Sequence, residues 1–224
     1  MIHLIETTHA GSVPASELPD WALSHGVTSL STAEVMHLCG LPANQVSQRM
    51  ASLRKGGKLF SPARGLWVPI PPEYRTWGAP DPMGYIDDMM AHLGAGYLVG
   101  WLTAAERHGA SHHAAQVFQV ATDKTVRARA FGRSRLEFYA RSYVGSATQS
   151  AELLRNTGVC VASPGATMLM LAADPGMCGG MSNVANLVIE LAEEHLDFEA
   201  EATTDAPLFL NAAARGLGLV LDGF

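Results

Sequence analysis

The sequence predicts an α+β protein, with an N-terminal winged helix-turn-helix domain followed by a mixed α/β C-terminal domain. Two short helical patterns and a strand–turn–strand pattern follow one another over residues 31–70, which is the order of elements in a winged helix. A segment rich in Pro then interrupts all periodicity. Beyond it, helical and strand patterns are mixed, which favours a second domain of the α/β kind.

Length and composition allow one large domain or two small ones. The chain has 224 residues, of which 48% are hydrophobic and 16% charged, so it is able to bury a core. No apolar run reaches the roughly 18 residues of a membrane span, and the N-terminus lacks the pattern of an export signal. The 3 cysteines are scattered and form no CxxC pair, which favours free thiols in a reducing compartment. We therefore expect a cytoplasmic protein without a membrane partner.

Charge is distributed unevenly along the chain. The formal net charge is −6, and residues 151–224 contain 2 basic and 10 acidic residues. Residues 35–72, in contrast, contain five basic residues and no acidic one. Phosphate would be repelled by the C-terminal third, so a duplex nucleic acid is expected to contact the first two thirds of the chain.

The first predicted helices lie before and inside the motif. A short helix is expected over residues 18–25, stopped by Gly26. The first helix of the motif begins at Ser31, which has the spacing of a capping box with Glu34. Gly40 follows that helix at the point where a tight turn needs a left-handed residue.

The second helix of the motif is predicted over residues 42–55. At 100° per residue, Val46, Met50 and Leu53 form one apolar stripe, which we expect to face the core. The opposite side is polar, and it is the predicted DNA-reading face: Asn44, Gln45, Ser47, Gln48, Arg49, Ser52, Arg54 and Lys55. Amide side chains suit bidentate contacts with adenine in the major groove, and basic side chains suit phosphates. The alternative is an ordinary solvated helix face.

A β-hairpin completes the motif. Residues 58–61 and 66–70 read as its strands, with residues 62–65 as the turn. Lys58 at its base and Arg64 at its tip are the predicted DNA contacts of this wing. At the tip, Arg64 would reach a phosphate or a minor groove.

The Pro-rich segment over residues 74–82 is interpreted as a stiff linker. It divides the chain into a DNA-binding domain, residues 1–75, and an α/β domain, residues 83–224. The elements expected in the second domain are, in chain order, helices over 83–93 and 97–108, a strand over 116–122, a hairpin of 126–130 with 136–143, a strand over 159–161, and helices over 163–173, 182–195 and 208–215. In the helix over 163–173, Ser163 is the expected N-cap and Pro164 the first helical residue.

Two clusters of polar residues in the second domain are candidate sites. Arg127, Arg129, Arg133 and Arg135 form a second basic face, which could extend a DNA footprint, bind RNA, hold an acidic partner or simply be solvated. His108 and its neighbours His112 and His113 lack the ligand spacing of a metal site. The sequence contains no recognisable nucleophile–base pair or pair of catalytic carboxylates, so we expect neither catalysis nor a cofactor.

The order of these segments resembles the AbiEi family of antitoxins from type IV toxin–antitoxin systems, in its actinobacterial branch. The resemblance covers residues 18–195 and is carried by the segments SPARGLWVPIPPEYR, YLVGWLTAAERHGA and SPGATMLMLAADPG, the last before a GG loop. It implies a winged helix that represses its own operon by binding inverted repeats in the promoter. It also implies a C-terminal domain that counteracts a nucleotidyltransferase-like toxin without a stable complex.

The resemblance carries over the exposed side of the helix at residues 42–55, the wing residues Lys58 and Arg64, and the second basic face. The family continues beyond a helix that corresponds to residues 214–218, so we expect the last helical part to be absent or shortened here. The alternative function is a ligand-responsive winged-helix regulator with a sensor domain, and an enzyme acting on RNA or phosphate is a third.

Overall fold

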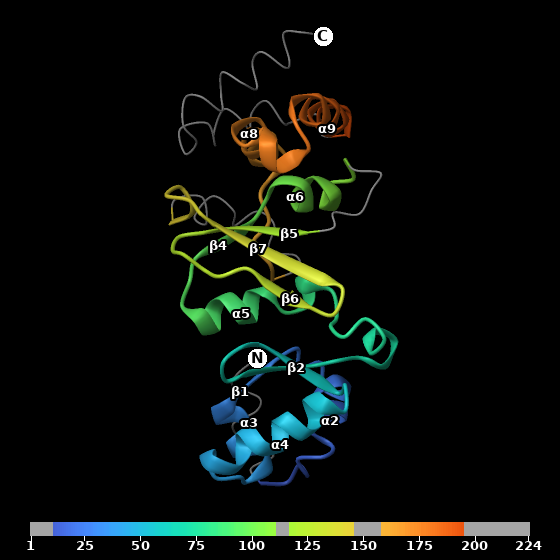
Figure 1. Ribbon diagram of the computed structural model, residues 1–224, viewed down its shortest axis with the longest axis vertical. Helices are drawn as coiled ribbons and strands as arrows, with labels where there is room; N and C mark the ends of the chain where they lie inside the picture. The colour runs from blue at the N-terminus through green and yellow to red at the C-terminus, as the bar shows by residue number, and fades with distance from the viewer. Residues whose placement is uncertain (1–10, 111–116, 146–157, 195–224) are drawn as a thin grey trace. The chain divides into compact units, whose positions relative to one another are not determined.

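Two units, each with its own sheet, make up the chain in the computed structural model, which describes residues 11–110, 117–145 and 158–194 (Figure 1). One unit comprises Met1–Gly94 and Arg129–Ser134, and the other comprises Ala95–Ala128 and Arg135–Phe224. The predicted domain division between residues 75 and 83 stays a prediction.

The first unit has the element order and sheet order of a winged helix. In chain order, its elements are α2 (Leu18–Ser24), β1 (Leu30–Ser31), α3 (Thr32–Cys39), α4 (Ala43–Lys55), β2 (Leu59–Ala63) and β3 (Leu66–Pro69). The three strands are antiparallel in the order β1-β3-β2, with Leu30 opposite Trp67. The sequence did not predict β1, because two residues are too few to show a period.

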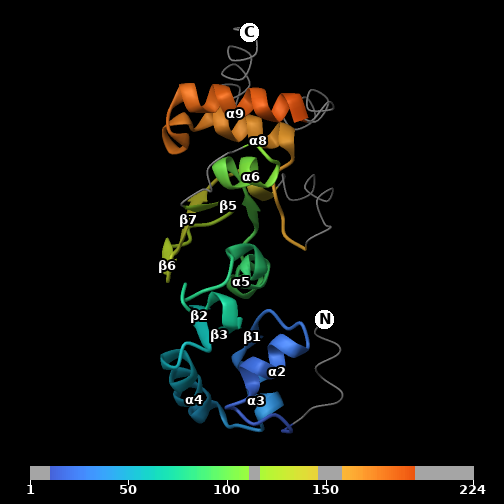
Figure 2. The same cartoon turned by 90° about the vertical axis from the view of Figure 1, so that its right-hand side faces the viewer.

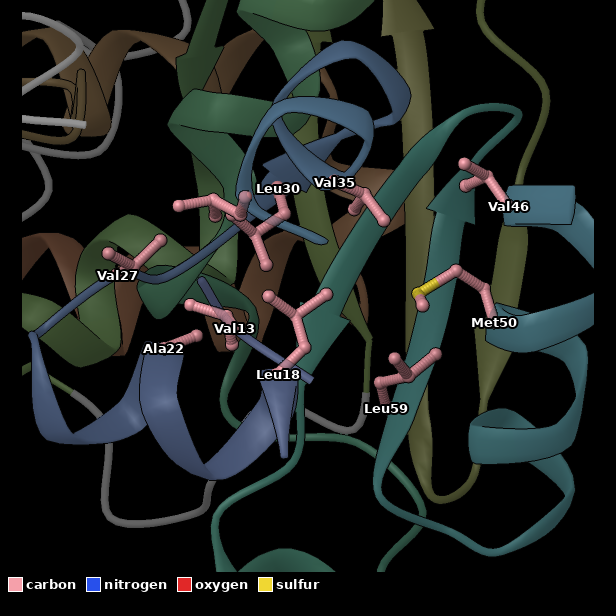
Figure 3. Packing of buried hydrophobic residues seen from close by; sticks show 10 residues of the cluster. Val13, Leu18, Ala22, Val27, Leu30, Val35, Val46, Met50 and Leu59 are labelled. Atoms are coloured by element: carbon pink, nitrogen blue, oxygen red, sulfur yellow. The ribbon is translucent and has the colours of Figure 1, made fainter. Parts of the chain in front are cut away.

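One face of this sheet closes the helical core. Val35, Val46 and Met50 are completely buried, and Leu59 of β2 is 3% exposed. In Figure 3, Met50 of α4 and Leu59 of β2 point toward one another. The predicted inward stripe is confirmed, with Leu53 partly buried at its edge.

The opposite face of the sheet is covered as well. Phe60, the neighbour of Leu59 in β2, lies 5.1 Å from the Tyr85 ring and 5.0 Å from the Phe131 ring, centroid to centroid. Tyr85 directly precedes α5 (Ile86–Leu93), and Phe131 ends β6 (Arg129–Phe131). Figures 1 and 2 show α5 on the other side of the sheet from α3 and α4. The hairpin is thus the middle layer of the first unit.

The segment over residues 74–82, expected to be a linker, is part of the first unit. It lies between two short 3-10 helices, Pro72–Tyr74 and Pro82–Gly84. The Arg133 amide donates to the Trp77 carbonyl at 3.1 Å, and a Cβ at Gly132 would lie 1.6 Å from that oxygen. Only Gly permits this approach, which anchors the segment to the turn after β6.

Over the residues that the structure describes, the second unit combines a sheet with three helices. Its strands β4 (Tyr97–Val99), β5 (Phe118–Thr122) and β7 (Ser134–Ala140) are neighbours in that order, antiparallel and then parallel. The helices are α6 (Trp101–Arg107), α8 (Pro164–Ala173) and α9 (Met181–Glu194). Figure 2 shows α8 between α6 and α9, and its residues Pro164–Ala172 are all buried.

The prediction of one helix over residues 97–108 is wrong. Residues 97–99 form strand β4, and α6 begins only after Gly100. The three strand residues are buried on both faces, so they read as a short apolar run that periodicity cannot tell from a helix. The change of direction occurs at Trp101, a non-glycine residue with a φ of 50°. Similarly, the strand expected over 159–161 is a single parallel bridge between Val99 and Val161.

Several other expectations are confirmed. Ser163 caps α8 by accepting from the Ala166 amide at 3.1 Å, with Pro164 in the first turn. Strand β5 and helix α9 lie where they were predicted, with α9 described as far as Glu194. The helix expected over 208–215 lies outside the described residues, as do His112 and His113.

Candidate nucleic-acid interface

Helix α4 presents the predicted reading face to solvent. Its two fully buried residues, Val46 and Met50, fix the rotation of the helix about its axis. All the polar residues predicted to read DNA are therefore exposed: Asn44, Gln45, Ser47, Gln48, Arg49, Ser52, Arg54 and Lys55. Asn44, Gln45 and Gln48 lie in the first half of the helix, and the basic residues lie in the second half.

Local interactions set the position of α4 relative to α3. Ser31 accepts from the Glu34 amide at 3.2 Å, and the Glu34 carboxylate accepts from the Ser31 amide at 2.6 Å, so the capping box is present. Gly40 ends α3 with a φ of 61°, as the turn requires. Helix α4 begins at Ala43, one residue later than predicted, so Pro42 is its N-cap and not its first helical residue.

The tip of the hairpin is shorter than predicted. Strand β2 continues to Ala63, so the turn consists of Arg64 and Gly65. The Arg64 side chain is exposed. The Gly65 carbonyl accepts from the Thr32 amide at 2.9 Å and from the Thr32 hydroxyl at 3.2 Å. These bonds hold the tip beside the first turn of α3.

Lys58, at the base of the hairpin, forms an ion pair with a residue that is distant in the sequence. Its Nζ lies 3.5 Å from a carboxylate oxygen of Asp20 in α2, and an Arg75 nitrogen lies 3.7 Å from the other oxygen. The Lys58 and Asp20 side chains are 39% and 56% exposed, so this ion pair contributes little stability. It does place a negative charge beside a predicted phosphate contact. Asp20 lies outside the acid-free segment, and no local pattern in the sequence points to it.

The second basic face consists of residues with different environments. Arg129 and Arg133 belong to the first unit, and Arg127 and Arg135 to the second. Arg133 lies over the Trp77 ring, 5.9 Å from its centroid. Arg135 pairs with Glu137 at 2.7 Å. Arg127 is exposed. A shared binding role for these four residues stays a prediction.

Arg129 points inward. Its Nη1 donates to the Pro62 carbonyl in β2, and its Nε is buried without a hydrogen-bond partner. Burial lowers the pKa of the Arg129 guanidinium, because desolvation disfavours the charged form. This arginine therefore connects β6 to β2 through a hydrogen bond. The sequence predicted this residue as part of a binding surface.

A polar cluster organises the second unit. One Asp174 oxygen accepts from the Trp101 indole Nε1 at 3.2 Å and from Arg141 at 2.9 Å. The Arg141 guanidinium also lies over the Trp101 ring, 5.5 Å from its centroid. Gln119 accepts from the Leu102 amide at 3.0 Å and so caps α6. The cluster fixes the start of α6 and the end of α8 to the sheet.

Two cysteines and one histidine that could carry chemistry have structural environments. Burial, together with Asp174, raises the pKa of Cys178 to about 12, and burial also raises the pKa of Cys39, so neither thiol is activated as a thiolate. His108 bonds through Nε2 to the Ala162 carbonyl at 2.7 Å. Over residues 11–110, 117–145 and 158–194, no group of three His, Cys, Asp or Glu residues could hold a metal ion.

Within the same three ranges, none of the helices has the length and apolar character needed to cross a membrane.

These features define a two-unit α+β protein whose first unit has the element order of a winged helix, with an exposed, acid-free polar face on α4. Among known proteins, the family model of the AbiEi antitoxin C-terminal domain matches residues 97–217, more than half of the 224 residues. The chain therefore belongs to the AbiEi antitoxin family, and it is the antitoxin of a toxin–antitoxin system. No curated protein sequence matches it.

A solved structure has the same fold. The crystal structure of the RV2827C protein from Mycobacterium tuberculosis superposes with a TM-score of 0.63, covering 93% of this chain and 76% of that one at 16% identity. At this identity the likeness concerns the fold alone. It confirms the predicted α+β class.

The polar cluster generates a stability prediction. Replacing Asp174 with Ala leaves the buried Trp101 indole N–H without its acceptor, so the free energy of unfolding should fall by about 1–3 kcal/mol. Urea unfolding of the full chain measures the change. Glu193→Ala, at an exposed position of α9, is the matched control and should change stability by less than about 0.5 kcal/mol. Equal stability of the two variants would contradict a structural role for the cluster.

Proposed function

We propose that this antitoxin represses its own operon by binding inverted repeats in the promoter, and that it counteracts a nucleotidyltransferase-like toxin without forming a stable complex and without catalysis. The proposal places DNA binding in the first unit. It rests mainly on one observation, the exposed and acid-free face of α4 in a winged helix.

The position of each residue on α4 supports a division of roles. In helix-turn-helix proteins, the N-terminal residues of the recognition helix reach base edges in the major groove. The amides Asn44, Gln45 and Gln48 occupy that half of α4. Arg49, Arg54 and Lys55 follow in the second half, where cations would contact the phosphates that border the groove.

The wing extends this surface. Its tip lies beside the first turn of α3, so Arg64 projects from a segment that the protein holds in place. Lys58 lies at the other end of β2, next to the C-terminal end of α4. A duplex seated on α4 would meet cations from both ends of the strand. An inverted repeat would bind two copies of the chain, one on each half-site.

The first test separates base reading from phosphate binding. Binding to DNA from upstream of the gene should weaken steeply with salt, because phosphate contacts release counterions. Gln48→Ala should lower the preference for the promoter over unrelated DNA, at a cost of about 1–3 kcal/mol. Arg64→Ala should weaken binding to all DNA sequences about equally. It should also reduce the slope of log affinity against log salt concentration by about one. Fluorescence anisotropy over a salt series measures both effects. Binding that is indifferent to salt would exclude the proposed mode.

The Asp20 carboxylate provides a second test of the same surface. Asp20→Asn removes the negative charge shared by Lys58 and Arg75, so affinity for duplex DNA should rise about twofold to fivefold at low salt and converge with wild type at high salt. Glu193→Gln changes the net charge equally in the second unit and serves as the control. An equal gain in both variants would mean that only net charge matters, and would remove Lys58 from the interface.

The antitoxin role is tested through growth. Co-expression with the product of the adjacent gene should restore growth that this product alone arrests. Because the proposal separates the two activities, Gln48→Ala should bind the promoter more weakly and keep full rescue. The two purified proteins should also fail to co-elute in size-exclusion chromatography. Loss of rescue in Gln48→Ala, with the fold intact, would show that DNA binding and toxin neutralisation are not separate.

A further inference from the structure

Helix α5 contacts the winged helix through two polar side chains as well as through its apolar face. The Asp88 carboxylate accepts from the Thr28 hydroxyl at 2.6 Å, just before β1. The His92 Nε2 bonds to the Arg64 carbonyl at 3.0 Å, at the tip of the wing. Asp88 and His92 are four residues apart, so they lie on one side of α5, a turn apart.

The direction of the second bond is fixed by its acceptor. A carbonyl oxygen only accepts, so the Nε2 of His92 must carry the proton.

The wing tip is held from two sides. Its Gly65 carbonyl accepts from Thr32 in α3, and its Arg64 carbonyl accepts from His92 in α5. Gly65 has a φ of 81°, and a Cβ there would lie 3.2 Å from the Thr32 hydroxyl and 3.9 Å from the His92 ring. A two-residue turn is thus enclosed between two helices, and the Arg64 side chain alone is left exposed.

Packing alone does not require these hydrogen bonds. Ile86, Met89 and Met90 are completely buried and already attach α5 to β2. His92, by comparison, is exposed and adds little to the burial of apolar surface. Its hydrogen bond instead restricts the conformation of the turn that carries Arg64. A binding segment that is ordered beforehand loses less entropy on association.

We propose that His92 is a positioning residue for the wing, and that α5 is part of the DNA-binding unit because it holds Arg64 in the geometry that meets DNA. This inference rests on the proposed function. It identifies a helix that the sequence assigned to the second domain as a determinant of DNA affinity.

The hold on the turn is measured without DNA. The Thr32 amide donates to Gly65, so its hydrogen exchange reports whether the tip stays in place. In full-length His92→Ala, Thr32 should exchange about threefold to tenfold faster, which is the effect of losing one hydrogen bond. The Ile70 amide, bonded to the Lys58 carbonyl at 2.9 Å at the open end of the hairpin, should be unchanged.

A matched pair of substitutions tests the geometry of the bond. The side-chain nitrogen of Gln reaches about as far as the Nε2 of His, whereas the shorter Asn places its nitrogen near the position of Nδ1. His92→Gln should therefore keep the slow exchange of Thr32 and the wild-type affinity, and His92→Asn should behave like His92→Ala. If any polar residue sufficed at this position, His92→Gln and His92→Asn would show the same Thr32 exchange and the same affinity.

DNA binding then separates positioning from contact. His92→Ala should weaken promoter binding about threefold to tenfold with an unchanged salt slope, because no phosphate contact is lost. Arg64→Ala should reduce the slope and leave Thr32 exchange unchanged, because the Arg64 carbonyl remains. Unchanged affinity in His92→Ala, or unchanged Thr32 exchange, would overturn the inference and leave the proposed function standing. Absence of salt-dependent promoter binding by the wild-type chain would overturn the proposed function itself, and the role of His92 in DNA binding with it.

Discussion

The burial of the β2–β3 hairpin on both faces is the constraint on which the first unit depends. Successive residues of a strand point to opposite sides, so Leu59 completes the core of the helices and Phe60 packs against Tyr85 and Phe131. A register shift of one residue would turn Leu59 and Phe60 to the opposite faces of the sheet and disrupt the packing on both sides. The position of α4, and hence of its polar face, follows from this strand.

The three-layer arrangement also restricts the motion of the wing. A hairpin covered on one side would be free to move at its tip, whereas this one is held by Thr32 on one side and His92 on the other. The basic residues in and beside the wing therefore have different environments. Arg64 projects from an ordered turn, Lys58 shares Asp20 with Arg75, and Arg129 of β6 points inward and donates to the Pro62 carbonyl of β2.

The second unit is built around a different kind of interaction. Polar side chains, with the half-buried Asp174 accepting from both Trp101 and Arg141, hold the start of α6 and the end of α8 together. Removing Asp174 costs more than one hydrogen bond contributes, because the Trp101 side chain stays buried without an acceptor for its N–H. Membership of the AbiEi antitoxin family covers this unit, through residues 97–217. The family match supports the antitoxin role and the winged helix supports DNA binding, so the two halves of the proposed function depend on different parts of the chain.

The sequence by itself determined the features that depend on neighbours a few residues away. The capping box of Ser31 and Glu34, the inward stripe of Val46 and Met50, and the cap of α8 at Ser163 all depend on spacings of three or four residues. The polar face of α4 followed from that stripe, because a helix with one side buried must expose the other.

Only the tertiary structure decided the features that join distant segments. Strand β4 exists because β5 pairs with it, and its three apolar residues have no pattern of their own. Asp20 meets Lys58 across 38 residues, and His92 meets Arg64 across 28. A side chain's own sequence context contains no trace of such a partner, because the chain must first fold to bring the two together. For this reason the exposed residues of α4 could be predicted one by one, and the contact of α5 with the wing tip could not.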